Sequence, residues 1–392
     1  MDVRALLIVN PHATTTTKVR RDVIVHALAS ELDLEVVHTR YRGHASPVAE
    51  AAARDGYGLV LTLGGDGTVN EAVNGLLRAH PPDGARTAPS AGPTADGRTA
   101  VSAQPAASAQ LAASALPAGN AQPGNSPQPA GGAQPAAGTQ SPGADRSSAA
   151  LLADPLPAPP PISAAPSGPL FAAIPGGNAN VFARGLGLAA DAVDATGQIL
   201  ASLEAGRTRT VGLGLAGDRY FCFNAGLGLD AEVVRVVEGV RARGRMLSPA
   251  LYVWTAARQF GWVTNRREPA LTLERDGAPA MEGLFLGIVS NTSPWTYLGE
   301  RPVHASPAAG FDTGLDLFAL RKLTTLRTLN ALRQMFGNGR GPAGRYVVSL
   351  HDQGTLSFRA SRPVAFQVDG EYMGEREHVI LRSIPNAMRV LV

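Results

Sequence analysis

A glycine-rich string near the start of the chain carries the clearest chemical signal. Residues 61–71 read Leu-Thr-Leu-Gly-Gly-Asp-Gly-Thr-Val-Asn-Glu. Consecutive glycines let a backbone approach a phosphate closely, and a helix that begins here would present free N–H groups at its positive end. Asp66 adds an acceptor for Mg²⁺ or its waters. The string lacks the ending of a Walker A loop and the spacing of a dinucleotide fingerprint. We therefore interpret it as another kind of phosphate loop, although an isolated glycine turn is more often structural.

A second chemical centre is Asp369-Gly370-Glu371, about 300 residues later. Phosphoryl transfer to an alcohol needs positioning, charge neutralisation and an acceptor for the hydroxyl proton. A glutamate on a glycine turn could reach such a hydroxyl. The local sequence alone favours a plain hairpin turn, because Asp-Gly is a common turn dipeptide.

Further motifs occur in a fixed order along the chain. They occupy residues 9–11 (Val-Asn-Pro), 38–39 with 43–45, 64–75, 174–187, 223–230 and 367–371. Together they resemble the catalytic-domain family of the diacylglycerol kinases, which includes bacterial diacylglycerol kinases and the sphingosine and ceramide kinases. The resemblance spans nearly the whole chain outside one low-complexity segment. It implies a nucleotide-binding α/β domain related to that of NAD kinases, followed by a β-rich domain, with the active site between them.

The resemblance also implies which residues form the site and which cofactors they bind, namely ATP and Mg²⁺. The residues that would line the nucleotide are Asn10, Thr39, Gly64, Gly65, Asp66, Gly67, Thr68, Asn70 and Asn178. The family usually has threonine where this chain has Asn178, whose amide has a different reach. Bacterial members use the glutamate equivalent to Glu371 as the base. Sphingosine-kinase-type mechanisms assign deprotonation to the position of Asp66, so both remain candidate catalytic residues.

A structural metal site is a further implication of the resemblance. Bacterial members often carry an Asp-Asp-Gly stretch that holds a structural Mg²⁺, and residues 311–316 match that region. Thr313 replaces the second aspartate, so we expect a weakened or absent metal with Asp312 and Asp316 as the remaining ligands. The alternative is that both are turn residues. Asp66 would serve the Mg²⁺ that accompanies ATP.

The elements that must position these residues alternate between strand and helix in the first part of the chain. Short apolar runs at 3–9, 34–39, 58–63 and 171–175 predict strands, and the segments between them have helical spacing. Apolar strands separated by helices indicate a parallel sheet that is covered on both faces. We therefore predict an α/β domain formed by residues 1–80 and 169–205.

Residues 81–168 differ sharply in composition from the rest of the chain. They hold seventeen of the thirty prolines and only seven charged residues. Such a segment cannot offset its ordering entropy by burying apolar side chains, so we predict a disordered insertion.

Many short strands separated by turn signals follow residue 206, among them runs at 219–225, 283–290, 355–359 and 364–368. They predict a mainly antiparallel, β-rich lipid-substrate domain over 206–392, interrupted by helices at roughly 231–260 and 324–336. The overall fold class is therefore α/β with a β-rich second domain. Four arginines (Arg235, Arg241, Arg243 and Arg245) precede four aromatic residues (Tyr252, Trp254, Phe260 and Trp262), so this stretch is either a lipid-facing surface or a solvated basic face with aromatics in the core.

The bulk composition limits the partners. A formal net charge of +3 is too small to indicate nucleic acid, but it is compatible with transient contact with an anionic membrane surface. The single cysteine, Cys222, lies in an apolar run and cannot form an internal disulfide, which fits a reducing cytosol. The N-terminus does not resemble a signal peptide, and no segment reaches the roughly 20 apolar residues of a membrane span. We expect a cytoplasmic protein that is peripheral at the inner membrane surface.

Three functions remain open at this stage. The leading hypothesis is an ATP-dependent lipid kinase that transfers the γ-phosphate to a lipid alcohol, with diacylglycerol as substrate and phosphatidic acid as product. The alternatives are an NAD kinase, which shares the Gly-Gly-Asp-Gly-Thr loop, and a lipid- or nucleotide-binding protein without catalysis. The oligomeric state is open, and a homodimer is one option.

Overall fold

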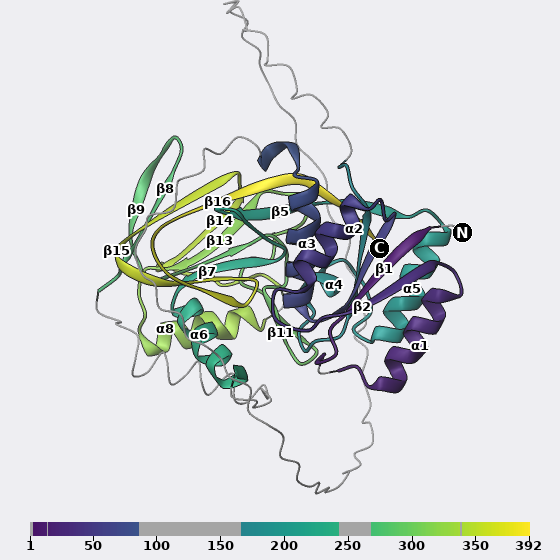
Figure 1. The fold of residues 1–392 in the computed structure, drawn as a ribbon. Coiled ribbons are helices and arrows are strands. Elements are labelled where there is room, and N and C mark those ends of the chain that lie inside the picture. The colour runs from purple at the N-terminus through teal and green to yellow at the C-terminus, as the bar shows by residue number, and fades with distance from the viewer. Residues whose placement is uncertain (1–2, 14, 86–165, 243–267, 338) are drawn as a thin grey trace, which may run out of the picture. The chain divides into compact units, whose positions relative to one another are not determined.

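The computed structural model describes residues 3–13, 15–85, 166–242, 268–337 and 339–392 (Figure 1). Most of the predicted insertion over 81–168 lies outside these residues, so the insertion and the domain bounds stay predictions. Most of the basic and aromatic helix predicted over roughly 231–260 also lies outside the described residues. Among the described helices, none has both the length and the apolar character that crossing a membrane requires.

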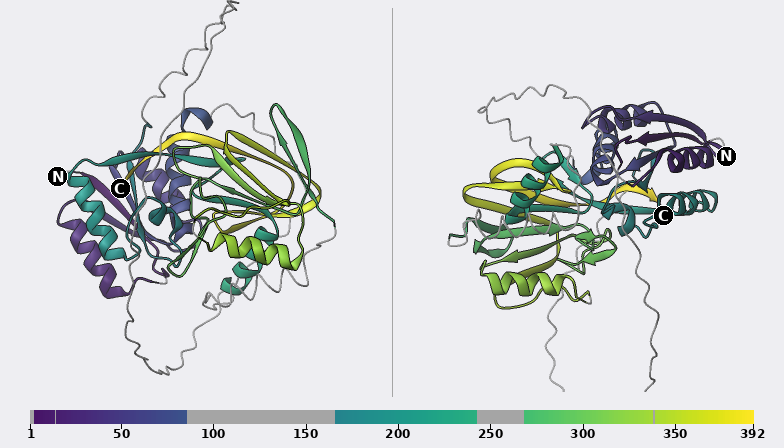
Figure 2. Two further views of the ribbon diagram at one scale, coloured as in Figure 1. Left: turned by 180° about the vertical axis from the view of Figure 1, so that it is seen from behind. Right: turned by 90° about the horizontal axis from the view of Figure 1, so that it is seen from below.

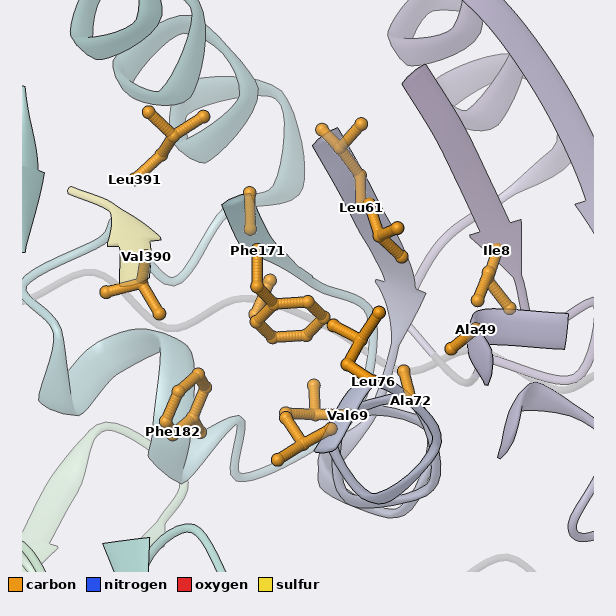
Figure 3. Close-up of a cluster of buried hydrophobic side chains, with 14 of the residues drawn as sticks. Ile8, Ala49, Leu61, Val69, Ala72, Leu76, Phe171, Phe182, Val390 and Leu391 are labelled. Carbon is orange, nitrogen blue, oxygen red and sulfur yellow. The ribbon is translucent and has the colours of Figure 1, made fainter. Parts of the chain in front are cut away.

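The first half of the fold, here called the α/β part, runs from β1 to α5. Its elements are β1 (Arg4–Val9), α1 (Lys18–Ala29), β2 (Asp33–His38), α2 (Ala45–Arg54), β3 (Leu59–Gly64), α3 (Asp66–Ala79), the short 3-10 helix η1 (Asp83–Ala85), β4 (Leu170–Pro175), α4 (Val181–Gly185) and α5 (Ala192–Glu204). The strands pair in parallel in the order β4-β3-β1-β2, with Ile8 opposite both Val37 and Thr62. Helix α1 packs beside α5, and α2 packs beside α3, on opposite faces of this sheet (Figures 1 and 3). The predicted parallel sheet with covered faces is confirmed.

Local sequence explains these elements. All six residues of β3 are buried, which suits an apolar strand at the centre of a parallel sheet. Helix α1 begins after Thr17, whose side chain accepts a hydrogen bond from the amide of Arg20. Helix α5 begins after Asp191, whose carboxylate accepts from the amides of Val193 and Asp194.

The second half of the fold, here called the β-rich part, runs from β5 to β16. Its elements are β5 (Thr208–Ala216), β6 (Arg219–Phe221), β7 (Asn224–Gly228), α6 (Leu229–Ala242), β8 (Leu271–Arg275), β9 (Ala278–Leu284), β10 (Leu286–Ser290), β11 (Thr296–Leu298), β12 (Arg301–Val303), β13 (Leu315–Leu320), α8 (Thr325–Met335), β14 (Val347–Gln353), β15 (Thr355–Val368) and β16 (Glu371–Leu391). Apart from one contact of β16 with β4, the strand pairs in this part are antiparallel, as predicted.

Two strands predicted as continuous are interrupted. The segment predicted over 219–225 is split between β6 and β7, because the amides of Cys222 and Phe223 turn away to donate to the carboxylate of Asp369. The segment predicted over 283–290 is split into the end of β9 and the start of β10. Conversely, the runs predicted at 355–359 and 364–368 belong to one long strand, β15.

Strand β16 joins the two parts of the fold. It begins at Glu371 in a hairpin with β15, and it ends beside β4, where Val390 lies opposite Phe171. Figure 3 shows Val390 and Leu391 in the same buried cluster as Phe171 and Phe182. One strand therefore starts at a candidate catalytic residue and is anchored at its far end in the core of the α/β part.

The packing of α2 against α3 leads to a stability prediction. A Cβ atom on Gly75 would lie 2.1 Å from the carbonyl oxygen of Ser46, so this helix crossing tolerates only glycine. We expect Gly75→Ala to lower the free energy of unfolding by about 1–3 kcal/mol. Gly197→Ala in the exposed interior of α5 is the matched control, because a Cβ atom there meets nothing within 4 Å. It should be neutral or stabilise by up to about 1 kcal/mol. Urea unfolding measures both, and equal midpoints for the two variants would contradict the steric explanation.

Candidate active site at the glycine-rich loop

Glycines from two neighbouring loops lie backbone to backbone at the carboxyl ends of β3 and β4. A Cβ atom on Gly177 would come within 2.7 Å of the Cα atom of Gly65, and one on Gly176 within 3.0 Å of the Cα atom of Gly64. The amide of Gly176 donates to the carbonyl oxygen of Gly64 at 2.8 Å. The glycines therefore have a structural role in bringing the two loops together, besides any role at a phosphate.

The predicted nucleotide residues gather at the carboxyl ends of the four parallel strands. The amide of Thr39 donates to the carbonyl oxygen of Val9 at 2.8 Å, which places Thr39 beside Asn10. Asn10 Nδ2 donates to Thr68 Oγ1 at 3.2 Å. Asn178 is exposed and directly follows Gly177 in the loop after β4. This edge is where open parallel sheets bind ligands.

Asp66 stands in the first turn of α3, directly after the glycine pair. Its Oδ1 accepts a hydrogen bond from the amide of Phe182 at 3.3 Å. Burial raises the pKa of Asp66 to about 6, and the nearby carboxylate of Asp369 acts in the same direction, against the amides of Val181, Phe182 and Asn180. The glycine-rich loop and the distant Asp-Gly-Glu motif are therefore close enough for their charges to interact.

Asp369 is the centre of a buried hydrogen-bond network. It is only 6% exposed and adopts a left-handed backbone conformation at φ 47°. Its two oxygens accept hydrogen bonds from the amides of Cys222 (2.6 Å), Phe223 (3.0 Å) and Asn224 (3.0 Å). Burial raises the pKa of Asp369 above its ordinary range, and these amides act against that rise. The Asp-Gly-Glu motif, which local sequence alone predicts as a plain turn, thus also fixes the segment between β6 and β7 through these hydrogen bonds.

Asn70 connects the hydrogen-bond network of Asp369 to the glycine-rich loop. Its Nδ2 donates to Asp369 Oδ2 at 2.7 Å and to the carbonyl oxygen of Tyr220 at 2.9 Å. Its Oδ1 accepts from Arg219 Nε at 3.0 Å and Arg219 Nη2 at 2.6 Å. Asn70 is 1% exposed and both amide protons are engaged within the protein. Two residues after Thr68, α3 is therefore bonded directly to the Asp-Gly-Glu hairpin.

Glu371, the other candidate base, lies between two guanidinium groups. Arg219 Nη2 is 2.6 Å from Glu371 Oε2, and Arg42 Nη2 is 2.7 Å from Glu371 Oε1. Arg42 also lies 2.7 Å from Glu238 of α6. Partial burial alone would lower the pKa of Arg42, but attraction to Glu371 and Glu238 outweighs this and raises it. The Glu371 side chain is 22% exposed, so it is held by the two arginines and still reachable from solvent.

Glu71 fixes the loop that carries Arg42. Its carboxylate accepts hydrogen bonds from the amides of Gly43 at 2.7 Å and Ala45 at 3.2 Å, at the beginning of α2. Burial raises the pKa of Glu71, while these amides lower it. A carboxylate at the start of a helix is well placed for its dipole. The Asn70-Glu71 pair of the glycine-rich motif therefore positions both arginines around Glu371.

A second buried hydrogen-bond network, centred on Gln367, stabilises the hairpin between β15 and β16. Gln367 Nε2 donates to Asn224 Oδ1 at 2.7 Å and to Asp230 Oδ2 at 2.8 Å, while Gln367 Oε1 accepts from the amide of Gly370 at 2.8 Å. Asp230 is 8% exposed, and burial raises its pKa to about 6, with the Gln367 hydrogen bond acting against the rise.

The candidate structural-metal residues have other partners. Asp312 is exposed and forms an ion pair with Arg209. Asp316 is buried and accepts hydrogen bonds from His351 Nδ1 at 2.7 Å and from the amide of Asp352 at 3.0 Å. Across the described residues, no three or more His, Cys, Asp or Glu side chains form a group that could hold a metal ion. A structural Mg²⁺ at Asp312 and Asp316 stays a prediction.

Sequence reasoning missed Arg42, Arg219 and Glu238 as residues of the site. Arg219 and Glu371 are 152 residues apart in sequence, and Arg42 and Glu371 are 329 apart, so no local pattern could pair them. One available signal was the position of Arg42 directly before the Gly43-His44-Ala45 motif. Cys222 is buried, and burial raises the pKa of its thiol well above the ordinary value.

Comparison with known families bears on this geometry. Residues 4–120 match the model of the diacylglycerol kinase catalytic domain. The resemblance that the motifs indicated is thereby confirmed, and the match includes the glycine-rich loop and Arg42. It supports a lipid kinase, while Arg219 and Glu371 lie beyond the matched residues. No curated protein matches the chain in sequence.

Solved structures share the fold. A diacylglycerol kinase from Bacillus anthracis str. Sterne is similar at a TM-score of 0.57 and 16% identity, covering 99% of this chain and 96% of its own. A candidate diacylglycerol kinase from the same organism is similar at a TM-score of 0.61 and 19% identity, with the same coverage. The predicted fold class is confirmed by these structures. An NAD kinase from Archaeoglobus fulgidus, at a TM-score of 0.43 and 9% identity over 99% of this chain and 93% of its own, is too remote to indicate a function.

The buried carboxyl of Asp230 gives a pH-dependent stability prediction. Its folded pKa of about 6 exceeds the ordinary 3.8, so the native state holds the proton more tightly than the unfolded chain. This group therefore costs stability as the pH rises through the range between 4 and 6. We expect Asp230→Asn to gain stability relative to wild type over that range, on the order of 3 kcal/mol at most. Urea unfolding of both proteins at pH 4, 5, 6 and 7 measures the difference, and a difference independent of pH would contradict the assignment.

Proposed function

We propose that this protein is an ATP-dependent lipid kinase that transfers the γ-phosphate to a lipid hydroxyl, with diacylglycerol as acceptor and phosphatidic acid as product. The observation that carries the proposal is the bridge of Asn70, which ties the helix of the glycine-rich loop to Arg219 and Asp369, two residues before Glu371. A phosphate loop and a proton acceptor are thereby held in one site. The match to the diacylglycerol kinase catalytic domain supports kinase chemistry on a lipid.

The nucleotide would bind along the carboxyl edge of the parallel sheet. At the start of α3 the amides of Thr68 and Val69 donate to the carbonyl oxygen of Gly65. The amides of Asp66 and Gly67 precede these first hydrogen bonds of the helix, so they can bind phosphate oxygens. Asn10, Thr39 and Asn178 border this edge, as described above. We assign Asn70 a positioning role instead of a direct nucleotide contact, because both of its amide protons are engaged within the protein.

Asp66 would hold the Mg²⁺ that accompanies ATP. Mg²⁺ is usually bound through one or two carboxylates together with substrate phosphates, so it needs no closed cage of protein ligands. The residue fits this use, because burial and the charge of Asp369 disfavour its own negative charge and a cation would offset both. When bound, Mg²⁺ would neutralise charge on the transferring phosphoryl group.

The two arginines supply further positive charge. Arginine binds carboxylates and phosphates with the same planar fork, so Arg42 and Arg219 can stabilise both Glu371 and a nearby phosphoryl group. Each guanidinium is fixed by a second partner, Glu238 for Arg42 and Asn70 for Arg219. Their positions are thereby set before any substrate arrives, as electrostatic catalysis requires.

Glu371 is the preferred proton acceptor. Each of its oxygens is engaged by one arginine, but a carboxylate offers about four acceptor sites, so a substrate hydroxyl can still donate to it. Asp66 is the rival base, because a pKa of about 6 suits proton transfer near neutral pH.

The direct test is a phosphorylation assay with purified protein, ATP and Mg²⁺ over a panel of lipid alcohols and NAD, with products identified by mass spectrometry. We expect phosphatidic acid from diacylglycerol and no NADP. Turnover of NAD alone would identify an NAD kinase. Tight ATP binding with no turnover of any lipid alcohol would indicate a non-catalytic binding protein, and either result would refute the proposal.

Single substitutions assign the base. We expect Glu371→Gln to lower kcat by roughly 10²–10⁴ while the unfolding midpoint changes little, because general-base catalysis contributes about that much. Glu377→Gln, an exposed glutamate on the same strand, is the matched control and should retain wild-type activity. Loss of activity in Asp66→Asn with Glu371→Gln unaffected would transfer the base role to Asp66.

A further inference from the structure

Helix α8 exposes an apolar stripe. Leu326, Leu329, Leu332 and Phe336 recur at helical spacing and are 82%, 56%, 40% and 45% exposed. The opposite face of the helix buries Thr328, Ala331 and Met335. Leucines exposed to this degree are unfavourable in water, so a contiguous set on one helix suggests a surface that is covered when the protein works.

The sequence around α8 is strongly basic. Residues 321–345 contain six Arg and Lys residues and no Asp or Glu, whereas the whole chain has a net charge of only +3. All six cations are exposed, and none takes part in the ion pairs found among the described residues. Six cations without an acidic residue among them therefore surround one helix with an exposed apolar face.

Three of these cations share a single aromatic ring. Arg327 lies 3.9 Å, Lys322 4.9 Å and Arg345 5.6 Å from the ring centre of Tyr346. The ring holds the cations close together beside α8, and no carboxylate of the described residues forms an ion pair with them. Such an arrangement is complementary to a dense negative surface.

The buried face of α8 connects it to the candidate active site. Ala331 and Met335 belong to the same hydrophobic cluster as Val233 and Val237 of α6, and Glu238 of α6 binds Arg42. Figure 1 draws α8 and α6 along the same edge of the β-rich part, and the right view of Figure 2 shows strands of that part between the two helices. The apolar stripe is thus on the half of the fold that supplies Glu371.

We propose that the exposed face of α8 and the basic segment 321–345 dock this protein on the surface of an anionic lipid bilayer. The leucines and Phe336 enter the boundary between headgroups and acyl chains, and the arginines contact lipid phosphates, as in interfacial amphipathic helices. The proposal rests on the proposed function, because a kinase for a lipid alcohol must reach a substrate that resides in a bilayer.

Charge argues against two other partners for the exposed face of α8, a second copy of the chain and residues 243–267. In a symmetric dimer through α8 the same patch of both copies would meet, so that two segments of charge +6 would face each other. Residues 243–267 are also rich in arginine and contain no Asp or Glu, so they offer no complementary charge. An anionic bilayer would both bury the apolar stripe and neutralise the cations.

The test is co-sedimentation with vesicles of phosphatidylcholine, alone or mixed with phosphatidylglycerol. We expect wild type to bind the mixed vesicles much more strongly, and less strongly as salt is added. The double substitution Leu326→Ser with Leu329→Ser should weaken binding by at least about ten-fold, and Arg333→Glu should weaken it further. Val19→Ser with Val23→Ser, two exposed valines of α1, is the matched control and should bind like wild type.

Activity measurements separate failure of docking from failure of the proposed function. The double α8 variant should keep wild-type turnover on a short-chain, water-soluble diacylglycerol and lose turnover on diacylglycerol in mixed vesicles. Unchanged vesicle binding by this variant, or equal wild-type binding to both kinds of vesicle, would overturn the docking proposal. If light scattering finds a wild-type dimer that the double variant does not form, the stripe is a contact between copies. That result would also overturn the docking proposal. If wild type binds the mixed vesicles but phosphorylates no lipid, the docking proposal is supported and the kinase proposal is refuted.

Discussion

The buried carboxylate of Asp369 is the constraint on which the site depends. A carboxylate removed from water must be hydrogen-bonded, and Asp369 meets this need with three consecutive backbone amides and the side chain of Asn70. Those amides belong to the break between β6 and β7, while Asn70 belongs to the helix after the glycine-rich loop. One side chain thus joins a strand break, a helix and the hairpin that begins at Glu371. Asp369 adopts a left-handed backbone conformation between β15 and β16.

The arrangement around Glu371 follows from this constraint. Asn70 uses its donors on Asp369 and Tyr220, which leaves its oxygen to fix Arg219 against Glu371. The next residue, Glu71, fixes the loop of Arg42 through the amides of Gly43 and Ala45. Two adjacent residues of one helix therefore place both arginines. The positive charge that these arginines bring is balanced by Glu238 and Glu371, whereas the basic segment around α8 has no such balance. Under the two proposals, the balanced arginines would bind a phosphoryl group and the unbalanced cations an anionic bilayer.

Much of the fold could be predicted because local signals were strong. The mostly apolar run of β3 indicated a buried strand, and the glycine-rich string marked the start of α3. Long-range pairing could not be predicted from one sequence. Nothing near Arg219 indicates that it binds Asn70, 149 residues earlier in the chain. The strand predicted through Cys222 and Phe223 was broken because their amides are used by Asp369, and the apolar pattern of that segment carries no trace of this partner. The exposed leucines of α8 posed the opposite problem, since helical spacing alone does not show which side of a helix is buried.

A double-mutant cycle on the hydrogen bond between Asn70 and Asp369 tests the central claim most directly. Urea unfolding of wild type, Asn70→Ala, Asp369→Asn and the double variant gives the coupling energy between the two side chains. If this contact unites the glycine-rich loop with the Glu371 hairpin, the double variant should be more stable than the sum of the single effects predicts, by about 0.5–3 kcal/mol. Effects that add within about 0.3–0.5 kcal/mol would show that the two motifs are energetically independent, and would contradict the account.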